Sequence, residues 1–484
     1  MSPAIAKGAY YQTLTVFFHA GVNWRVSVPT GVFPAFPLVD ISSSSYYGAM
    51  VIPMDNLDSD ASDCSIASRY SLRLLNQSGM SNSPREVTAG IHPAKNWAES
   101  GLMTLTGRTP TLCPVPLASC ADGALNAFRA LCAVPVYPDV SGTDLLVERA
   151  AITTQRGNGS SSSGGHCRLL PCLDGTIALN LTRPSDWDLL PAWLETDSVS
   201  DWPAIETLLQ RRDTNTLVSR GRLLGLAVTN ARTRRQAPYN WISFDTITDA
   251  DSQRERKPTV VDLSSLWAGP LCSSLWQAAG ADVIKVESSQ RPDGARIGPR
   301  AFFAMLNQDK QSVELDLHTP AGQQALLDLI RKADIVLEGS RPRALRQMGI
   351  IAEELIAELP HLTWVSITGY GRTEPQANWI AYGDDAGVAA GLSNILHQVT
   401  GEWLICGDAI ADPLTGLHAA LAGWASWLHG GGHLLDVSLE KTVRYCIAAT
   451  APADGDYSAR QQRWTQYLQA HALEPLPPRC KRVA

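Results

Sequence analysis

The sequence lacks the short motifs that mark several common enzyme classes. It has no GxGxxG after a predicted strand, no Walker A lysine motif and no GxSxG elbow, and its ten cysteines include no CxxC pair and no Cys/His comb. Without those glycines a backbone cannot approach a pyrophosphate closely, which disfavours NAD binding. Scattered cysteines of this kind are typical of reduced thiols in a cytosolic protein. We therefore expect no metal ion and no permanently bound cofactor.

An excess of positive charge and a long apolar run are also missing. Lys and Arg number 40 against 47 Asp and Glu, which gives a net charge of −7, so the chain has no basic stripe of the kind that binds nucleic acid. The longest apolar stretch, at 414–428, is shorter than the roughly 18–20 residues needed to cross a bilayer. The N-terminus shows no signal-peptide pattern. We expect a soluble, cytoplasmic protein that binds neither nucleic acid nor membrane.

What the sequence does contain is a regular alternation of strands and helices after residue 258. Buried strands are predicted at 260–265, 282–287, 312–317, 334–338 and 362–371, with helices up to about residue 279 and at about 320–333. Pro270 suits the first turn of a helix and Gly280 suits its end. This order predicts an α/β fold with an open, parallel, Rossmann-like sheet in the C-terminal half.

The N-terminal half is less regular. Short β-like runs at 14–19 and 47–53, a serine run at 42–45 and turn signals near 55–65 precede one helical pattern at 122–131. A Gly/Ser run then leads into a strand-like segment, 167–181, with an Asp-Gly turn, and helical patterns cover 201–229. The polar stretch 230–258 is the best candidate for a domain boundary. The Gly/Ser run is either a linker or an active-site loop, and it contains Gly157, Gly159, Gly164 and Gly165.

An acidic residue stands at the start of the apolar helix that begins near 412. Asp412 directly precedes Pro413, which predicts that Asp412 is the N-cap and Pro413 the first helical residue. The helix dipole and the free N–H groups would then hold the carboxylate ionised. Two interpretations remain open at this point: an ordinary cap, or a carboxylate used as a nucleophile or base.

Segments between 258 and about 450 resemble the family III CoA-transferases (CaiB/BaiF type), which include formyl-CoA transferase, carnitine CoA-transferase and α-methylacyl-CoA racemase. The matching segments follow the family order over some 190 residues: VVDLSSLWAGPLCSSLWQAAGADVIKVE (260–287), RPDGARIGP (291–299), the segment 306–338, ITGYG (367–371), ADPLTGLHAALAG (411–423) and HLLDVSLEKTV (433–443).

The resemblance implies a nucleophile and a reaction. The family's Asp of the D-x-x-T/G-G motif falls on Asp412, with Thr415 and Gly416 completing the motif. In that family this Asp attacks an acyl-CoA thioester, and CoA passes to a carboxylic acid through anhydride and aspartyl-thioester intermediates, with CoA as part of the substrate. It also implies a homodimer. Two halves that imitate a dimer within one chain are the alternative.

The resemblance also suggests CoA contacts, although one family loop is altered. The family's E-N-F-x-P-G loop has lost its Asn, Phe and Gly, and reads EGSRPR at 338–343. Arginines in and after this loop would meet CoA phosphates by charge-assisted bonds, or would simply form a solvated helix start. The candidate contact residues are Trp267, Ala268, Leu315, Asp316, His318, Ser340, Arg341 and Arg346.

Two further activities remain as alternatives to CoA transfer. The racemase branch of the family uses a His upstream of the Asp, but here that position holds Tyr382 or a neighbour, so two-base proton exchange would have to use Asp384 or Asp385. The altered 338–343 loop also allows a non-catalytic CoA-binding scaffold. We predict a transferase.

The N-terminal half resembles the same family in weaker form. Aligning Gly123 with Gly416 places Ser119 at the position of the nucleophile. Asp122 is interpreted as a structural acid at the start of a helix. The predicted organisation is a degenerate CoA-transferase-like segment at 1–145, a small-domain-like segment and linker at 146–255, and a Rossmann-like domain bearing Asp412 at 256–484. We expect the glycines of 157–165 to cover Asp412, because a mixed anhydride must be protected from water.

Overall fold

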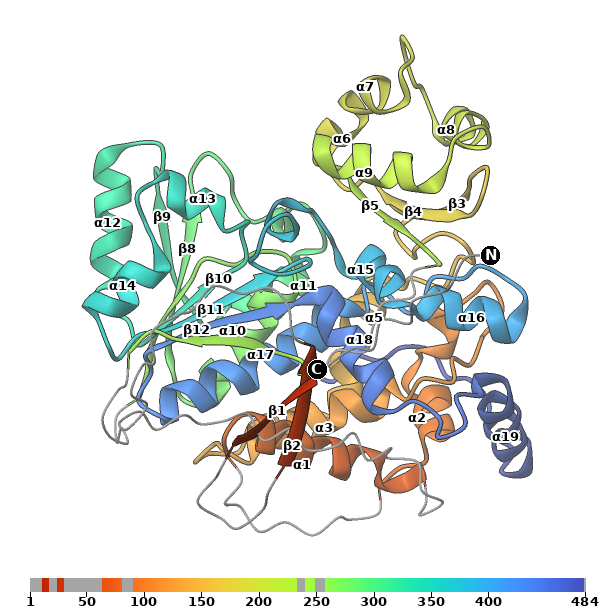
Figure 1. Ribbon diagram of the computed structural model, residues 1–484, viewed down its shortest axis with the longest axis horizontal. Coiled ribbons are helices and arrows are strands. Elements are labelled where there is room, and N and C mark those ends of the chain that lie inside the picture. The colour runs from red at the N-terminus through yellow and green to blue at the C-terminus, as the bar shows by residue number, and fades with distance from the viewer. Residues whose placement is uncertain are drawn as a thin grey trace, which may run out of the picture. The chain divides into compact units, whose positions relative to one another are not determined.

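The computed structural model describes residues 11–16, 24–29, 63–80, 90–232, 240–248 and 257–482 (Figure 1). The chain forms two compact units, Met1–Pro53 and Met54–Ala484. In the first unit, strands β1 (Tyr11–Val16) and β2 (Trp24–Pro29) pair antiparallel. β1 overlaps the strand expected at 14–19. The expected strand at 47–53, the serine run at 42–45, residues 55–62 and much of 230–258 lie outside the described residues.

A seven-stranded sheet forms the centre of the second unit. Its order is β6-β12-β11-β10-β7-β8-β9, and among the described strands every neighbouring pair is parallel except β6 with β12. The predicted α/β class with a parallel C-terminal sheet is therefore confirmed. The strands are β6 (Ser243–Thr246), β7 (Thr259–Asp262), β8 (Asp282–Ser288), β9 (Gln311–Leu315), β10 (Ile335–Glu338), β11 (Thr363–Thr368) and β12 (His433–Ser438).

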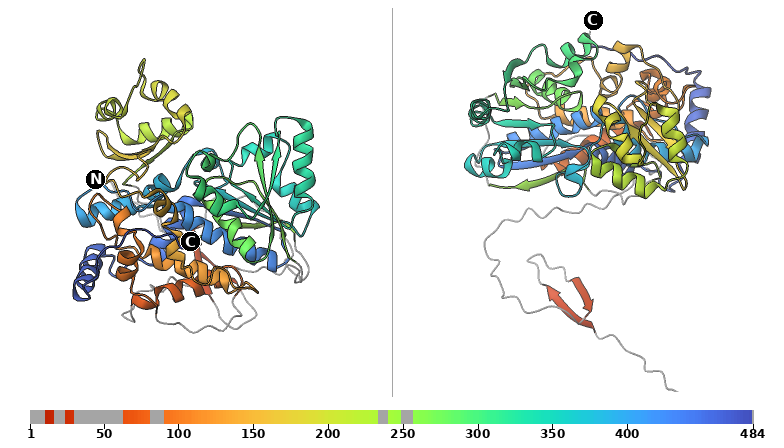
Figure 2. Two further views of the ribbon diagram at one scale, coloured as in Figure 1. Left: turned by 180° about the vertical axis from the view of Figure 1, so that it is seen from behind. Right: turned by 90° about the horizontal axis from the view of Figure 1, so that it is seen from above.

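Helices cover both faces of this sheet because successive strand residues point to opposite sides. Val260 packs into the cluster that contains α10 and α17, whereas Val261 packs with α12 and α14. Figure 2 shows helices on both faces of the sheet. One face carries α10 (Ala268–Ala278), α17 (Ala411–Leu428) and α18 (Leu439–Ala449), and the other α12 (Pro320–Ile330), α13 (Arg343–Gln347) and α14 (Ala352–Glu358).

The strand order reverses at β7. The chain runs from β7 outward to β8 and β9, and then returns to β10 on the other side of β7. In open α/β sheets, ligands bind beyond the carboxyl ends of the strands where the order reverses. The loops after β7 and β10 flank this position, and they carry Trp267 and Arg341 respectively.

A smaller antiparallel sheet lies between residues 167 and 230, with order β3-β4-β5. Its strands and the helices on it are β3 (Cys167–Pro171), β4 (Thr176–Asn180), β5 (Ala227–Asn230), α6 (Pro184–Asp188), α7 (Leu190–Leu194), α8 (Trp202–Leu209) and α9 (Thr214–Leu224). The Asp-Gly turn is found between β3 and β4. The expected helical region 201–229 holds two helices, but it ends in strand β5, which pairs with β4.

Further helices pack around these two sheets, and each one described is too short or too polar to span a bilayer. They are α1 (Ile66–Gln77), α2 (Pro93–Ser100), α3 (Leu117–Arg129), α4 (Gly142–Leu145), α5 (Glu148–Thr153), α11 (Arg300–Asn307), α15 (Gly383–Ala390), α16 (Leu392–Thr400) and α19 (Tyr457–Ala470), with short 3-10 turns η1 (Asp63–Ser65), η2 (Met103–Leu105), η3 (Gly294–Arg296) and η4 (Gln376–Asn378).

Helix α3 differs from its prediction. It begins five residues before the expected start at 122, so Asp122 lies inside the helix and the helix-start interpretation is wrong. The side chain of Asn96 and the backbone N–H of Thr143 each donate to the Asp122 carboxylate at 2.8 Å. Asp122 therefore joins α2, α3 and α4, which is still a structural role.

Two helix pairs in the second unit cross in the same way. A Cβ added to Gly123 would lie 2.6 Å from the carbonyl oxygen of Ala67 in α1, and one added to Gly416 would lie 2.6 Å from the carbonyl oxygen of Ala268 in α10. Both crossings need a residue without a side chain. The pair α1–α3 thus parallels the pair α10–α17.

In the regions of α3 and α17, two contacts join residues that are separated in the sequence by the same number of positions as these two glycines. Gly123 and Gly416 are 293 positions apart (416 minus 123), and so are Cys113 and Cys406, whose side chains hydrogen-bond to each other. The indole N–H of Trp424 donates to the carbonyl of Leu131 at 3.3 Å, again 293 positions apart. Contacts between equivalent residues are what a two-fold axis produces.

Candidate active site

The turn between β7 and α10 is held by buried ionic groups. Lys310 Nζ lies 3.1 Å from the Asp262 carboxylate, and the neighbouring backbone N–H of Ser264 donates to the same carboxylate at 2.9 Å. The lysines at 310 and 285 hold the pKa of Asp262 at about 2 despite its burial. Lys285 also pairs with Asp293 at 2.9 Å, and Asp293 accepts from the backbone of Leu266. This network fixes the backbone that leads into α10.

Trp267 and Ala268, two of the predicted CoA contacts, lie at the start of α10. Trp267 precedes the helix and is 1% exposed, and its ring meets Phe302 edge-on at 5.4 Å. The carbonyl of Ala268 is the atom that approaches Gly416. The first turns of α10 and α17 therefore touch, which brings the predicted nucleophile helix to the carboxyl end of β7.

Asp412 lies at the start of α17, but not as its cap. The helix begins at Ala411 after Ile410, so Asp412 is the second helical residue and Pro413 the third, and the N-cap prediction is wrong. The backbone N–H of Asp412 donates to Ala409 at 2.8 Å, which extends the first turn backwards. Asp412 is partly exposed, whereas nearly every other residue of the helix is buried.

The charge state of Asp412 also differs from the prediction. Burial raises the pKa of its carboxyl group to about 7, and Asp384 and other nearby carboxylates add to the rise. The expectation that the helix start alone would hold the group ionised is therefore wrong, because the loss of hydration outweighs it. The nearby guanidinium of Arg149 lowers the pKa and opposes the shift.

Three further aspartates surround this position. Asp384 accepts from the backbone N–H of Ala409 at 2.8 Å, and its pKa is raised by burial and by Asp408 to about 6. Asp385 accepts from Asn180 Nδ2 at 2.9 Å and has a pKa raised by burial to about 7. Asp408 lies in the turn before α17. The site therefore concentrates acidic groups, and the pKa values of Asp384, Asp385 and Asp412 are raised to about 6 or 7.

Arg149 is the cation that faces these carboxylates. Its Nε donates to Asp408 Oδ2 at 2.9 Å and its Nη2 to Asp408 Oδ1 at 2.5 Å, a bidentate pair in which the Asp408 side chain is only 1% exposed. The guanidinium carbon of Arg149 also lies 5.0 Å from the centre of the Trp267 ring. The sequence analysis missed Arg149 and Asp408. A single arginine in a short helix gives no local signal, because its partner is 259 positions away.

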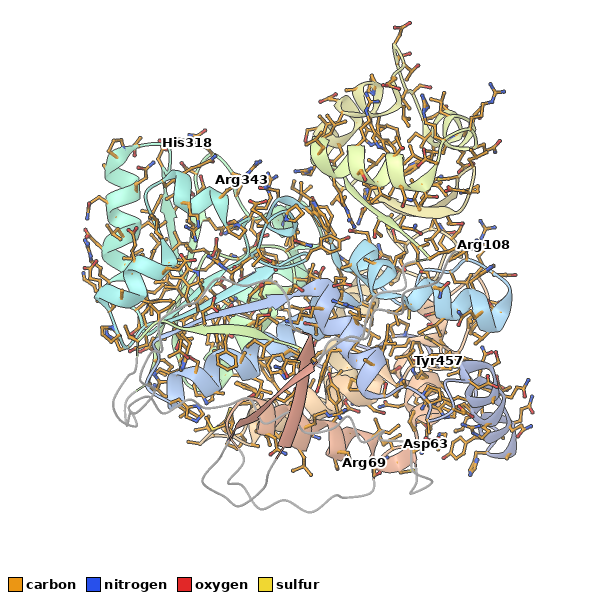
Figure 3. All side chains as sticks on the ribbon, in the orientation of Figure 1. Asp63, Arg69, Arg108, His318, Arg343 and Tyr457 are labelled. Carbon is orange, nitrogen blue, oxygen red and sulfur yellow. The ribbon has the colours of Figure 1, made fainter. Side chains whose placement is uncertain are left out.

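The other predicted CoA contacts lie at the carboxyl ends of β9 and β10. Leu315 ends β9, Asp316 accepts from the backbone of His318 at 3.1 Å, and His318 is exposed. Figure 3 shows His318 and Arg343 at the same end of the sheet. Ser340 donates to Glu338 at 3.3 Å.

The arginines of the loop after β10 differ in their surroundings. Arg346 forms an exposed ion pair with Glu353 at 2.6 Å. Arg341, in contrast, has no carboxylate within ion-pairing distance among the described residues, and its pKa is lowered by burial and by the charges of Arg343, Arg183 and Arg291. Of these three neighbouring arginines, Arg183 is paired with Asp186.

A cavity of about 320 Å³ opens beside the end of β9, next to Leu315. Glu287 at its wall is paired with Arg296 at 2.6 Å, and Glu314 adds a second carboxylate, so the cavity is acidic. Such a wall accepts hydroxyl or amino groups and repels phosphate. It is lined by Glu287, Ser288, Ser289, Pro292, Arg296, Ser312 and Glu314.

The glycine-containing segment 157–165 is an ordered loop, not a linker. The backbone N–H of Gly157 donates to Thr104 at 2.9 Å, and Leu169 in β3 donates to Ser160 at 2.7 Å. The carbonyl of Gly159 accepts from Ile405 at 3.0 Å. The loop is thus attached to the segment that leads into α17. Coverage of Asp412 by Gly164 and Gly165 stays a prediction.

Comparison with known proteins identifies similar sequences. Residues 257–473 match the family model described as CoA-transferase family III. The chain is 32% identical over 195 residues to a formyl-CoA:oxalate CoA-transferase of Escherichia coli, covering 38% of this chain and 47% of that protein. It is 28% identical over 258 residues to an acyl-CoA transferase of Fusarium pseudograminearum, covering 49% and 57%. The chain spans about half the length of the curated relatives it matches.

Solved structures give similar partial matches. The crystal structure of Rv3272 from Mycobacterium tuberculosis is 25% identical, with 46% of this chain and 58% of that chain covered and a TM-score of 0.37. A CAIB/BAIF family protein from Brucella suis is 27% identical, with 47% and 60% covered and a TM-score of 0.36.

Proposed function

We propose that this chain moves CoA between an acyl-CoA thioester and a carboxylic acid, with Asp412 as the nucleophile, because residues 257–473 match the model of CoA-transferase family III. The observation that carries the proposal is the position of Asp412. Asp412 is a partly exposed residue in the first turn of α17, and the next turn of this helix, at Gly416, abuts α10 at the carboxyl end of β7, beside the point where the strand order reverses.

The proposed reaction needs one carboxylate, on which thioester and anhydride bonds of similar energy form and break in turn. An oxygen of Asp412 attacks the carbonyl carbon of the thioester, and the C–S bond breaks. CoA leaves as a thiolate, and the acyl group remains on Asp412 as a mixed anhydride. The thiolate then attacks the Asp412 carbonyl carbon and releases the donor acid, which leaves an aspartyl-CoA thioester. The acceptor carboxylate attacks this thioester, which releases the CoA thiolate and leaves a second mixed anhydride on Asp412. The thiolate then attacks the acyl carbon of the acceptor and forms the new acyl-CoA. Asp412 is regenerated as a free carboxylate.

We place CoA along the carboxyl edge of the sheet. The first turn of α10, with Trp267 and Ala268, would contact the arm that reaches Asp412, and the cavity beside Leu315 would take uncharged groups of the adenosine. The anionic phosphates need cations. Arg341, with Arg343 and Arg291 near it, would supply such cations and so compensate for the altered 338–343 loop. Arg346 would have to leave Glu353 to contribute.

The glycines of 157–165 are proposed to limit the access of water to the anhydride. The bond between Gly159 and Ile405 anchors the loop seven positions before Asp412. The predicted cytoplasmic location and the homodimer remain predictions, with the intrachain pseudo-dimer as the alternative assembly.

Covalent labelling tests the nucleophile. Incubation with a panel of acyl-CoAs and intact-mass measurement is expected to show an acyl or CoA adduct on the wild-type chain. Asp412→Ala is expected to abolish the adduct and to lower transfer by at least about 1,000-fold, because the variant lacks the carboxylate that forms the proposed anhydride. Ser119→Ala, at the equivalent position in α3, is the matched control and should keep the adduct. An adduct that survives in Asp412→Ala contradicts the proposal.

One observation favours a second candidate, an acyl-CoA racemase. The carboxyl groups of Asp412 and Asp384 both have pKa values raised by burial to near neutral, as a two-base proton exchange requires. Incubation of a 2-methylacyl-CoA in heavy water separates the two reactions. Exchange of the α-proton without an acceptor acid and without an adduct would support the racemase.

A further inference from the structure

Arg149 connects the two first turns that form the proposed site. It lies on α5, far from Asp412 in the sequence, and its bidentate partner Asp408 lies in the turn that precedes α17. Its guanidinium also lies over Trp267, which precedes α10, at 5.0 Å. A guanidinium held on two sides in this way has little freedom to move. Its charge is therefore fixed relative to both helix starts.

More acidic than basic groups influence the charge of Asp412. Asp384 and Asp385 approach from α15 and Asp408 from the preceding turn, whereas Arg149 is the cation that approaches from α5. Asp408 accepts two hydrogen bonds from Arg149, but the cation still opposes protonation of Asp412. Burial and the α15 aspartates favour a protonated Asp412, and a protonated carboxyl group is a poor nucleophile toward a thioester.

We propose that Arg149 is a positioning residue whose guanidinium, held in a fixed place between Asp408 and Trp267, stabilises the negative charge of Asp412. This proposal rests on the proposed function. It means that the α5 region, in the half that lacks a nucleophile of its own, completes the site in the other half. The proton that Asp412 must lose before attack goes to solvent, since the carboxylate is partly exposed.

The pH dependence of acylation tests this role. The rate at which Asp412 is acylated in a single turnover is followed by intact mass from pH 5 to pH 9 in wild type, Arg149→Gln and Arg149→Lys. Loss of the charge in Arg149→Gln is expected to move the acidic limb of the pH–rate profile to higher pH by at least about one unit. The acylation rate at pH 6 should fall about tenfold or more, and the rate at pH 9 should largely recover. Arg149→Lys should keep most of the wild-type limb.

A neighbouring ion pair provides the matched control. Arg482 forms a bidentate pair with Glu148, the residue before Arg149, and both side chains are almost completely buried. Arg482→Gln therefore breaks a comparable pair on α5 without removing the charge beside Asp412. It should lower the thermal stability and leave the position of the acidic limb unchanged.

The outcomes separate this inference from the proposed function. If Arg149→Gln loses the same fraction of rate at every pH, its role is structural and the inference is overturned. Should that variant fail to fold, Asp408→Asn is the second test. This change frees Arg149 for Asp412, so the acidic limb of the pH–rate profile must shift to lower pH. No shift, or a shift to higher pH, overturns the inference. An adduct that persists in Asp412→Ala overturns the proposed function itself.

Discussion

At the scale of the residue, the site is defined by acids whose surroundings disfavour their charge. Asp412 and its position at a helix start follow from the sequence motif, because ADPLTG is local. Its pKa does not follow from the motif. The pKa depends on burial and on groups such as Arg149 and Asp384, which the fold brings from distant positions. The sequence therefore identified Asp412 as the proposed nucleophile, but it did not predict the raised pKa of this residue.

Asp385 gives a prediction about stability. It is buried, and its pKa rises from about 3.8 in an exposed state to about 7 in the fold, so it favours the fold below about pH 4 and loses that contribution as pH rises through 7. Asp385→Asn stays neutral throughout. Its stability relative to wild type should therefore increase between pH 5 and pH 8, by on the order of 2 kcal/mol. Thermal melts at both pH values measure the difference.

The control for this measurement is an exposed acid with the opposite shift. Asp213 caps α9, and its pKa is lowered by the backbone N–H of Thr216. Asp213→Asn should become less stable relative to wild type as pH rises from 3 to 6. A pH-independent difference for Asp385→Asn would contradict the assigned pKa.

At the scale of the element, hydrophobic runs predicted the central strands well. β7, β8, β9, β10 and β11 all overlap their predicted ranges. A parallel strand buried on both faces reads as an apolar run, as in β10 and β11, whereas β9 is a largely exposed edge strand. β6 was missed because its residues Ser243–Thr246 are all exposed, and β5 because four residues beside a helix carry little pattern. Their pairing partners, not their own sequences, determine them.

The crossing of α10 and α17 gives a prediction at this scale. Gly416→Ala would place a Cβ 2.6 Å from the backbone oxygen of Ala268, which cannot move independently of its helix. We expect a loss of about 1–3 kcal/mol of unfolding free energy in denaturant titrations. Gly387→Ala is the control, because its nearest neighbour is a methyl group of Ile410 at 3.2 Å that can shift. Equal stabilities of the two variants would contradict the prediction.

At the scale of the whole molecule, the two helix pairs and their contacts suggest one chain built from two related halves. The offset of 293 positions relates Gly123 to Gly416 and Cys113 to Cys406, and it also relates Ser119 to Asp412. The sequence analysis anticipated this equivalence from weak resemblance. The predicted boundaries at 145 and 255 both lie inside the second unit, and they remain predictions.

The fused arrangement makes a prediction about assembly. If one chain supplies both Arg149 and Asp412, the transfer rate per chain should stay constant on dilution from micromolar to nanomolar protein, and saturating acyl-CoA should leave one adduct per chain. Dilution series with intact-mass counting measure both quantities. A rate per chain that falls with dilution would instead show that a second copy completes the site.

The pairing of Arg149 with Asp408 across 259 positions also bears on how the protein is made. During translation the cation emerges 259 residues before its acidic partner, so a nascent chain carries an unmatched charge until Asp408 has been synthesised. A chain that stops between these two residues lacks both this ion pair and Asp412.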